Sequence, residues 1–184
     1  MIKWVMRRKL RAFEQAYGYD ASYMHEVLDL DVGAFFKFAR ATSIGKYRKD
    51  VPADAYYAAG LTASIQADCG PCTQLGVGFG LNEGVPARAL AAIVAGDETA
   101  MTGDVALGFR FARAVLARDP QADTWRAEVV RRWGPRSVLA LAFAMMAAQM
   151  YPMLKYALGH GKACTRVVVA GQTVTPPRIA VRAA

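Results

Sequence analysis

Two cysteines separated by two residues are the side chains in this sequence best suited to chemistry. Cys69 and Cys72 enclose Gly70 and Pro71, and thiols at this spacing can close a small disulfide on the first turn of a helix. There the unpaired backbone N–H groups and the positive end of the helix dipole stabilise a thiolate, which lowers the thiol pKa. Pro71 fits a first helical position, and Gly70 allows a sharp turn. The motif therefore predicts a redox-active dithiol at a helix start, and helix position favours Cys69 as the attacking thiol.

A histidine and a third cysteine form a second candidate group near the end of the chain. His160 and Cys164 lie in a glycine-containing segment that we expect to follow the last long helix. If that helix folds back toward Cys69, His160 supplies a proton acceptor and Cys164 exchanges with the dithiol. The plainer alternative is that His160 interacts with a helix C-terminus and Cys164 is a small buried residue. The candidate catalytic set is therefore Cys69, Cys72 and His160.

The same side chains also admit a metal-binding interpretation. Cys69, Cys72, His160 and Cys164 are ligand types that tetrahedral zinc accepts. However, Gly-Pro between the first two cysteines favours a disulfide turn, and the two half-sites lie far apart in the sequence. We therefore expect no metal and no other cofactor, with a structural zinc site as the alternative.

Composition bounds the fold class and the partners. The chain has 184 residues, 54% hydrophobic and 21% charged, so it buries too much apolar surface to be disordered and forms one domain over residues 1–184. The net charge is +8, but the basic residues are not interleaved with aromatic residues, which argues against nucleic-acid binding. The apolar excess predicts a homo-oligomer. Three cysteines cannot form a disulfide framework, which favours a reducing, cytoplasmic location.

Apolar residues recur at helical spacing along most of the chain, and Gly, Pro and Asp separate the segments. This pattern predicts an all-α fold, a helical bundle with helices over about 2–17, 22–30, 31–42, 52–68, 71–81, 86–94, 104–116, 121–133 and 135–159. The apolar run 138–148 is too short to span a membrane, so we expect a buried core or interface helix there. Beyond the helices, residues 167–175 predict either a small hairpin or a loose tail.

The first helix is basic and amphipathic. Its apolar residues predict a stripe that packs on the rest of the domain. Peripheral membrane contact through residues 1–17 is the less favoured alternative.

The segment before the cysteine pair separates two folds. A thioredoxin fold needs a β-branched strand there, whereas residues 55–68 are Ala-rich with helical spacing. In this helix-turn-helix context the chain resembles the AhpD-like, carboxymuconolactone decarboxylase family, an all-helical group whose redox branch carries Cys-x-x-Cys at a helix start. The matching residues are 57–64, 69–72, 84–86 and 89–97. The resemblance is strongest over about residues 50–115.

The resemblance implies an organisation and an order of attack. The implied parts are an N-terminal helical extension over 1–45, an AhpD-like core over 50–160 and a tail over 165–184. Family members form homo-oligomers, and the family favours Cys72 as the attacking thiol. Two positions depart from the redox branch, with Gly76 in place of a His and Tyr57 in place of a Glu. Because those residues relay protons in the family, the pair lacks its usual base.

We therefore expect a thiol–disulfide oxidoreductase or a thiol-dependent, alkylhydroperoxidase-like antioxidant protein. Its partners are a small-molecule or protein disulfide or peroxide as substrate, and a thiol as electron donor. Two alternatives stay open. One is a carboxymuconolactone decarboxylase-like lyase that does not use the thiols, and the other is a non-enzymatic helical oligomer with structural or zinc-bound cysteines.

Overall fold

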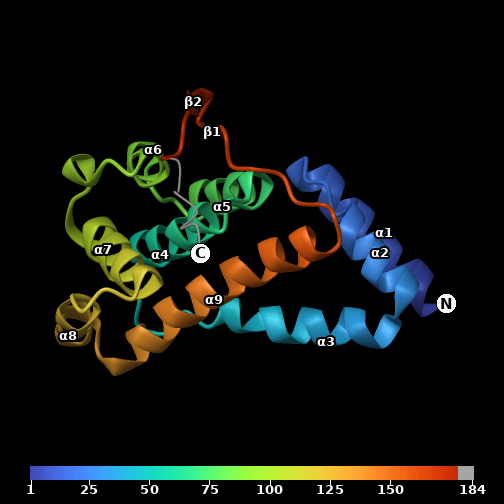
Figure 1. Cartoon of the computed structure of the whole chain (residues 1–184), viewed down its shortest axis with the longest axis horizontal. Coiled ribbons are helices and arrows are strands. Elements are labelled where there is room, and N and C mark those ends of the chain that lie inside the picture. The colour runs from blue at the N-terminus through green and yellow to red at the C-terminus, as the bar shows by residue number, and fades with distance from the viewer. Residues whose placement is uncertain (178–184) are drawn as a thin grey trace, which may run out of the picture.

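A computed structural model describes residues 1–177, which form an all-α fold with one small hairpin (Figure 1). The elements are α1 (Ile2–Tyr17), α2 (Ser22–Leu30), α3 (Val32–Thr42), the 3-10 turn η1 (Ser43–Lys46), α4 (Ala53–Gln66), α5 (Gly70–Asn82), α6 (Ala87–Ala95), η2 (Glu98–Ala100), α7 (Gly103–Ala117), α8 (Ala122–Trp133), α9 (Pro135–Ala157), β1 (Val167–Val169) and β2 (Gln172–Val174). The predicted all-α fold class is confirmed. The sequence pattern located the helices because Gly and Pro interrupt the helical periodicity close to where the helices end.

Helix α4 is the centre of the main body. It is apolar on most sides, and it packs against α5, α7 and α9. Small residues allow close approach, since Gly108 of α7 lies directly against the backbone of Ala55. Apolar clusters form on both sides of α4, one with α5, α6 and the hairpin, and one with α7, α8 and α9. Because three helices hold α4, the turn that follows it has a fixed position.

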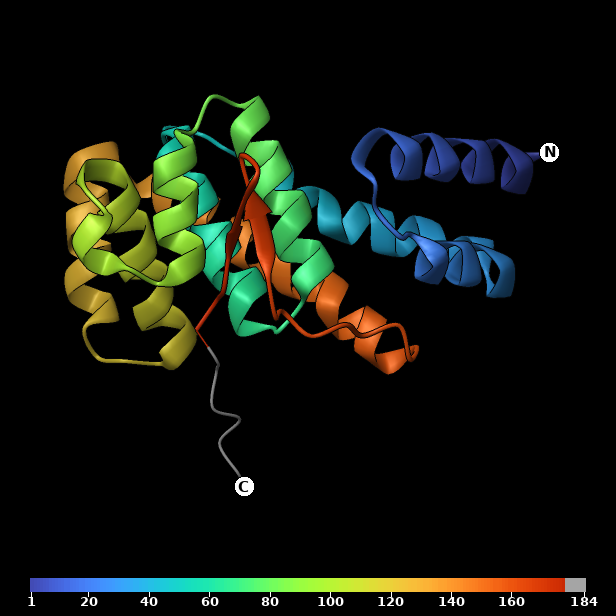
Figure 2. The ribbon, with the colours of Figure 1, turned by 90° about the horizontal axis from the view of Figure 1, so that it is seen from above.

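The first three helices form a lobe with its own apolar cluster at one end of the molecule (Figure 2). Tyr23 and Leu28 of α2 are fully buried in it, and Phe35 of α3 is buried to 7% exposure. The same cluster contacts Leu75 of α5 and Tyr151 of α9. The N-terminal helices are therefore attached to the body through α5 and α9.

Helix α1 buries only part of its apolar stripe. Met6, Leu10 and Phe13 pack against the N-terminal cluster, as the amphipathic pattern predicts. Trp4 is 65% exposed on the same basic helix. The helix ends at Gly18, whose φ of 58° is a conformation that glycine adopts without strain. Membrane contact through this helix stays a prediction.

Helix α9 has one buried and one exposed apolar side. Ala140 and Leu141 are fully buried in the core. Leu139, Met146 and Met153 recur every seven residues and are 50%, 51% and 73% exposed. The prediction of a core helix is thus confirmed for one side, and the other side presents an uncovered apolar stripe.

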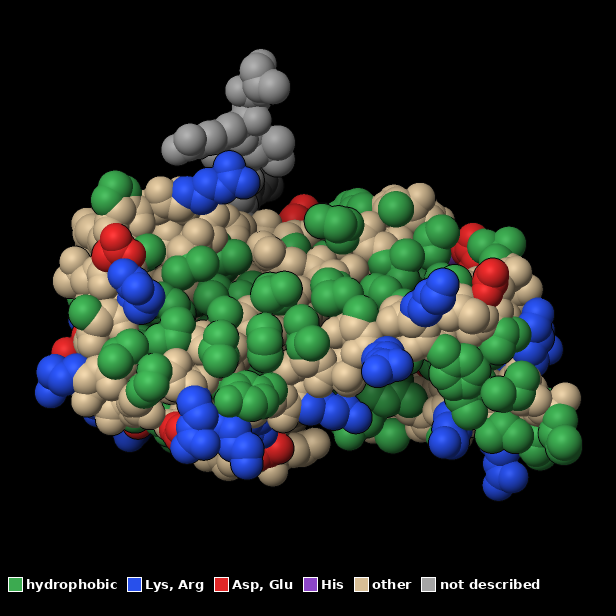
Figure 3. Space-filling model, turned by 90° about the horizontal axis from the view of Figure 1, so that it is seen from below, with side chains coloured by type: hydrophobic (Ala, Val, Ile, Leu, Met, Phe, Trp, Pro, Cys, Tyr) green, Lys and Arg blue, Asp and Glu red, His purple; other side chains and the backbone are tan. Residues whose placement is uncertain are grey.

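The same helix is long and apolar enough to cross a membrane, a criterion that core helices of soluble proteins also meet. In this structure 39% of its most apolar stretch is buried inside the protein. Figure 3 shows hydrophobic side chains gathered in a band across the underside of the molecule, the side on which α3 and the start of α9 lie in Figure 1.

The hairpin near the end of the chain packs on α5 and α6. Its strands are antiparallel, with Val167 opposite Val174. The Gln74 amide of α5 accepts from the Val168 N–H at 2.7 Å and donates to its carbonyl at 2.9 Å. Of the two predictions for this segment, the hairpin is confirmed. Residues 178–184 of the predicted tail lie outside the described residues.

The α4–α7 contact yields a stability prediction. We expect Gly108→Ala to lower the free energy of unfolding by about 1–3 kcal/mol, as overpacking does. The new Cβ would lie 2.5 Å from the Ala55 carbonyl oxygen, and backbone cannot move aside cheaply. Urea unfolding followed by far-UV circular dichroism measures the effect. The control is Gly78→Ala in α5, where a Cβ would have no atom within 4 Å apart from its own helix backbone. This variant should gain about 0.5–1 kcal/mol in free energy of unfolding. Equal midpoints for both variants would contradict this account of the contact.

Candidate active site

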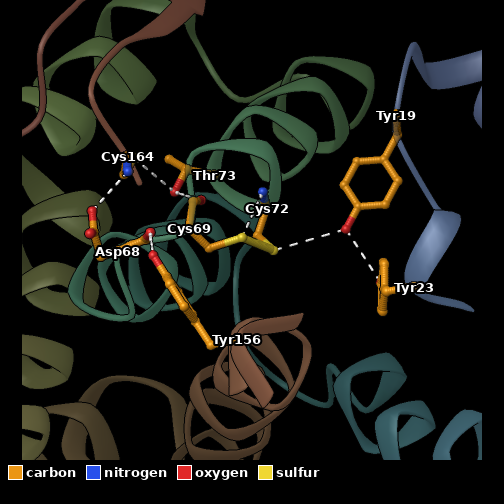
Figure 4. Close-up of a disulfide and its surroundings, with 8 residues drawn as sticks. All are labelled: Tyr19, Tyr23, Asp68, Cys69, Cys72, Thr73, Tyr156 and Cys164. Carbon is orange, nitrogen blue, oxygen red and sulfur yellow. Dashed lines mark hydrogen bonds between the residues drawn. A yellow bond between two sulfur atoms is a disulfide. The ribbon is translucent and has the colours of Figure 1, made fainter. Parts of the chain in front are cut away.

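The cysteine pair lies where the α4–α5 turn meets the first turn of α5. Cys69 and Cys72 form a disulfide, with their Cα atoms 5.3 Å apart (Figure 4). Cys69 is the N-cap of α5, and its Sγ accepts from the Cys72 N–H at 3.3 Å. Asp68, just before the pair, has a φ of 50°, in the left-handed region that Asp tolerates better than most residues. Both sulfur atoms therefore lie at the electropositive end of a helix.

The two sulfur atoms differ in exposure. Cys69 is 1% exposed, whereas Cys72 is partly exposed and lies in the wall of a cavity of about 690 Å³. A reactant entering this cavity meets Cys72 and not Cys69.

The cavity lies between the N-terminal lobe and the body, and its lining is predominantly apolar. The lining residues come from α1 to α5, from η1 and the residues after it, and from α9: Leu10, Phe13, Tyr19, Ala21, Tyr23, Met24, Thr42, Gly45, Lys46, Arg48, Tyr56, Tyr57, Gly60, Leu61, Ser64, Cys72, Leu75, Gly76, Phe79, Ala144, Ala147, Ala148 and Tyr151. Aromatic rings and short aliphatic side chains dominate this set, so the cavity suits an apolar small molecule better than a charged one.

Two tyrosines connect Cys72 to the N-terminal lobe. The Tyr19 hydroxyl lies 4.0 Å from the Cys72 Sγ. Because a disulfide sulfur carries no proton, the hydroxyl is the donor in this contact. It also lies 3.3 Å from the Tyr23 hydroxyl, which therefore donates to the Tyr19 oxygen. Figure 4 shows the Tyr19 hydroxyl between the sulfur and Tyr23.

A buried cation lies against the same two rings. The Lys155 ammonium of α9 is 4.4 Å from the ring centre of Tyr19 and 4.9 Å from that of Tyr23, and Lys155 is 3% exposed. Within residues 1–177 no carboxylate forms an ion pair with it; nearby Asp20 binds Lys162 at 3.1 Å. Burial lowers the pKa of Lys155 to about 8. Burial also raises the pKa of Tyr19 to about 12 and raises that of Tyr23, so both phenols are protonated near neutral pH.

Residues 159–166, here called the strap, cross the start of α5 on the other side of the disulfide. The Gly70 N–H donates to the Lys162 carbonyl at 3.2 Å. A Cβ on Gly70 would lie 2.8 Å from the Ala163 carbonyl oxygen, so only glycine fits there. The Cys164 N–H donates to Asp68 Oδ1 at 2.8 Å. The strap therefore covers the turn that holds Cys69.

The third cysteine is held by this strap. The Cys164 thiol donates to the Thr73 Oγ1 at 3.5 Å, and the Thr73 hydroxyl donates to the Cys69 carbonyl at 2.9 Å. Burial raises the pKa of the Cys164 thiol. Figure 4 shows Cys164 and Tyr19 on opposite sides of the disulfide. The structure thus brings Cys164 next to the pair, as a protonated thiol outside the cavity lining.

His160 lies on the same strap, but its ring is bound to α2. Its Nε2 lies 2.7 Å from Glu26 Oε2, and its Nδ1 lies 3.1 Å from the Ser22 hydroxyl. In the described part of the chain no hydrogen bond joins His160 to either cysteine of the pair. The proton acceptor expected at His160 is therefore not at the sulfur atoms, because both ring nitrogens are engaged by α2.

The zinc alternative has no support in the geometry. Cys69 and Cys72 are bonded to each other, and residues 1–177 contain no cluster of three or more Cys, His, Asp or Glu side chains suited to a metal ion.

The positions where the resemblance expects a Glu and a His both line the cavity. Burial raises the pKa of Tyr57 to about 12, so its hydroxyl is no base at neutral pH. Gly76 packs on Leu61, where a Cβ would lie 2.9 Å from the Leu61 Cδ2. Arg48 lies over the Tyr57 ring at 5.6 Å and pairs with Glu83 at 3.1 Å.

Comparison of the chain with protein-family models, with curated proteins and with solved structures finds no match.

Three residues near the disulfide were missed at the level of sequence. Tyr19 and Tyr23 have the four-residue spacing of one helical turn, which is also the spacing of core residues. Lys155 is a charge directly after a long apolar run, and this was the one local signal that could have marked it. Neither pattern states that these segments meet.

The buried ammonium yields a pH-dependent prediction. Lys155 ordinarily has a pKa of 10.5, and in the fold it is about 8, so between these values the unfolded chain binds a proton that the folded chain does not. Stability contributed by this group therefore rises with pH across that window. We expect the parent to gain free energy of unfolding relative to Lys155→Met between about pH 8 and about pH 10. Urea unfolding of both proteins measures this difference, and a pH-independent difference would contradict the burial effect.

Proposed function

We propose that this protein is a thiol–disulfide oxidoreductase of an AhpD-like type, acting on small apolar substrates. One observation carries the proposal: a Cys-Gly-Pro-Cys disulfide at a helix N-terminus has one sulfur buried and the other in the wall of a cavity of about 690 Å³. A purely structural crosslink needs neither this helix position nor the cavity.

The exposure of the sulfurs supports an order of attack. In the reduced protein the Cys72 thiolate attacks a substrate disulfide, its S–S bond breaks, and the first substrate thiolate leaves and takes a proton from water. The Cys69 thiolate then attacks the Cys72 Sγ and releases the second substrate thiolate. The dithiol loses two electrons and the substrate gains them. A thiol electron donor then reduces the Cys69–Cys72 disulfide.

The cavity lining supports the choice of substrate class. Its tyrosines, phenylalanines and aliphatic residues match an aryl or alkyl disulfide, and a folded protein chain would not enter a space of about 690 Å³. A hydroperoxide is the alternative oxidant for the same thiolate, as in a thiol-dependent antioxidant protein. In that case Cys72 would become a sulfenic acid, release the alcohol and condense with Cys69, with loss of water.

The resemblance to the AhpD-like family, the homo-oligomer and the cytoplasmic location belong to this proposal. The exposed stripe of Leu139, Met146 and Met153 on α9 supports self-association, because a large exposed apolar surface favours an interface. A reducing compartment would supply the thiol donor.

Two assays test the proposed function. Titration of free thiols before and after mild oxidation should show the reversible loss of two thiols per chain, because Cys69 and Cys72 are bonded in the structure. Cys72→Ser should abolish the reduction of an aryl disulfide by a thiol donor, since the sulfur at the cavity is then missing. The matched control is Cys164→Ser, which keeps the pair and should keep turnover.

Specific results would contradict the proposal. A thiol count unchanged by oxidant would remove redox chemistry. Turnover retained in Cys72→Ser would favour a lyase that does not use the thiols.

A further inference from the structure

The surroundings of Cys72 contain a hydrogen-bond donor, Tyr19, and a buried cation, Lys155, that lies against the Tyr19 ring. Tyr19 lies between α1 and α2, in the N-terminal segment to which the family resemblance does not extend. Its hydroxyl is 4.0 Å from the Cys72 Sγ and accepts from Tyr23 at 3.3 Å. Lys155 lies within 5 Å of both ring centres.

Burial of Lys155 is costly when the disulfide is intact. Lys155 is 3% exposed as a residue, so its ammonium loses hydration in the fold, and no carboxylate of residues 1–177 forms an ion pair with it. The faces of two aromatic rings compensate only part of that loss. The site would become favourable for the cation once a negative charge formed beside Tyr19. In the proposed function that charge is the Cys72 thiolate.

We propose that the Tyr19 hydroxyl is the catalytic hydrogen-bond donor that stabilises the Cys72 thiolate, and that Tyr23 and Lys155 are positioning residues that strengthen this donor. The inference rests on the proposed function for its role in turnover. No proton is transferred to the sulfur by the contact itself: when the Cys72 thiol ionises, its proton goes to water in the cavity, and the Tyr19 O–H turns to the thiolate. Hydrogen bonds to ionised groups are stronger than those to neutral ones.

Most of the other charged groups around the cavity are already paired. Besides Tyr19 and Tyr23, the cavity lining holds the phenols of Tyr56, Tyr57 and Tyr151 and the side chain of Lys46. Lys46 and the three phenols are the same in all the variants below. The paired groups on the surrounding elements are Arg48 with Glu83, Asp20 with Lys162, His160 with Glu26, His25 with Glu14, and Asp68 with the Cys164 N–H. Tyr19 is the side chain with a hydroxyl in contact with this sulfur. The α5 N-terminus acts on Cys72 as well, and it is common to all the variants below.

The test measures the thiolate directly. In the full-length chain with Cys69→Ser and Cys164→Ser, Cys72 is the single remaining cysteine, and the first of these substitutions keeps a side-chain oxygen at the N-cap of α5. The pH dependence of its alkylation by iodoacetamide gives the pKa of Cys72.

Adding Tyr19→Phe should raise this pKa by about one unit or more, since a hydrogen bond to a charged group is lost. Tyr23→Phe and Lys155→Met should raise it by less. Tyr47→Phe, a half-buried tyrosine outside the cavity lining, is the matched control and should leave it unchanged.

The outcomes separate the inference from the function. If Tyr19→Phe leaves the pKa of Cys72 unchanged while its circular dichroism spectrum matches the parent, Tyr19 is not the donor, whether or not the protein turns over disulfides. If Tyr19→Phe shifts the pKa and Lys155→Met does not, the role of the cation is overturned. A shifted pKa in a chain whose wild type forms no reversible disulfide would support the donor and contradict the oxidoreductase. In the wild-type background, Tyr19→Phe should lower the rate of disulfide reduction most at low pH and least at high pH.

Discussion

The contact between the strap and the first turn of α5 is the constraint on which the difference between the two cysteines depends. The Gly70 N–H is bonded to the Lys162 carbonyl, and the Ala163 carbonyl leaves no space for a side chain at position 70. With the strap in place, the turn at Cys69 is closed and the other sulfur faces the cavity. The helix dipole acts on both cysteines, so it cannot by itself distinguish them. Tertiary packing makes the distinction.

The N-terminal lobe gives the exposed sulfur its environment. Its residues close one side of the cavity, so that Cys72 faces aromatic and aliphatic side chains instead of bulk water. In such surroundings the effective dielectric constant is low, and a hydrogen bond or a nearby cation has a larger effect than at an open surface. The same burial keeps the phenols of Tyr19 and Tyr23 protonated and weakens the hold of Lys155 on its proton. The N-terminal lobe therefore sets the electrostatic environment of Cys72.

Local sequence patterns were sufficient to predict the helices and the position of the cysteine pair. Periodicity predicted the helices, and residues such as Gly18 and Gly96, both at positive φ, marked their ends. The spacing of Cys69 and Cys72 placed them on one helical turn without any knowledge of the fold. The hairpin could not be decided in advance, because its bonds to Gln74 join segments that are distant in sequence.

The surroundings of the pair depended on contacts that no local pattern encodes. His160 was expected near the cysteines, and the strap does pass there, but Glu26 and Ser22 on α2 bind its ring. Tyr19 and Lys155 meet across most of the length of the chain. Which side chain reaches the sulfur is decided by how the two ends of the chain pack together, and a sequence without its fold does not state that.

The position of the strap has a consequence for the motif as a transferable unit. Grafted onto the start of another exposed helix, Cys-Gly-Pro-Cys would bring its dipole and its spacing, but both sulfurs would be equally open to solvent. The strap, which crosses the start of α5, sets the difference in exposure between the two sulfur atoms. A chain cut after α9 would therefore keep the disulfide and lose this difference.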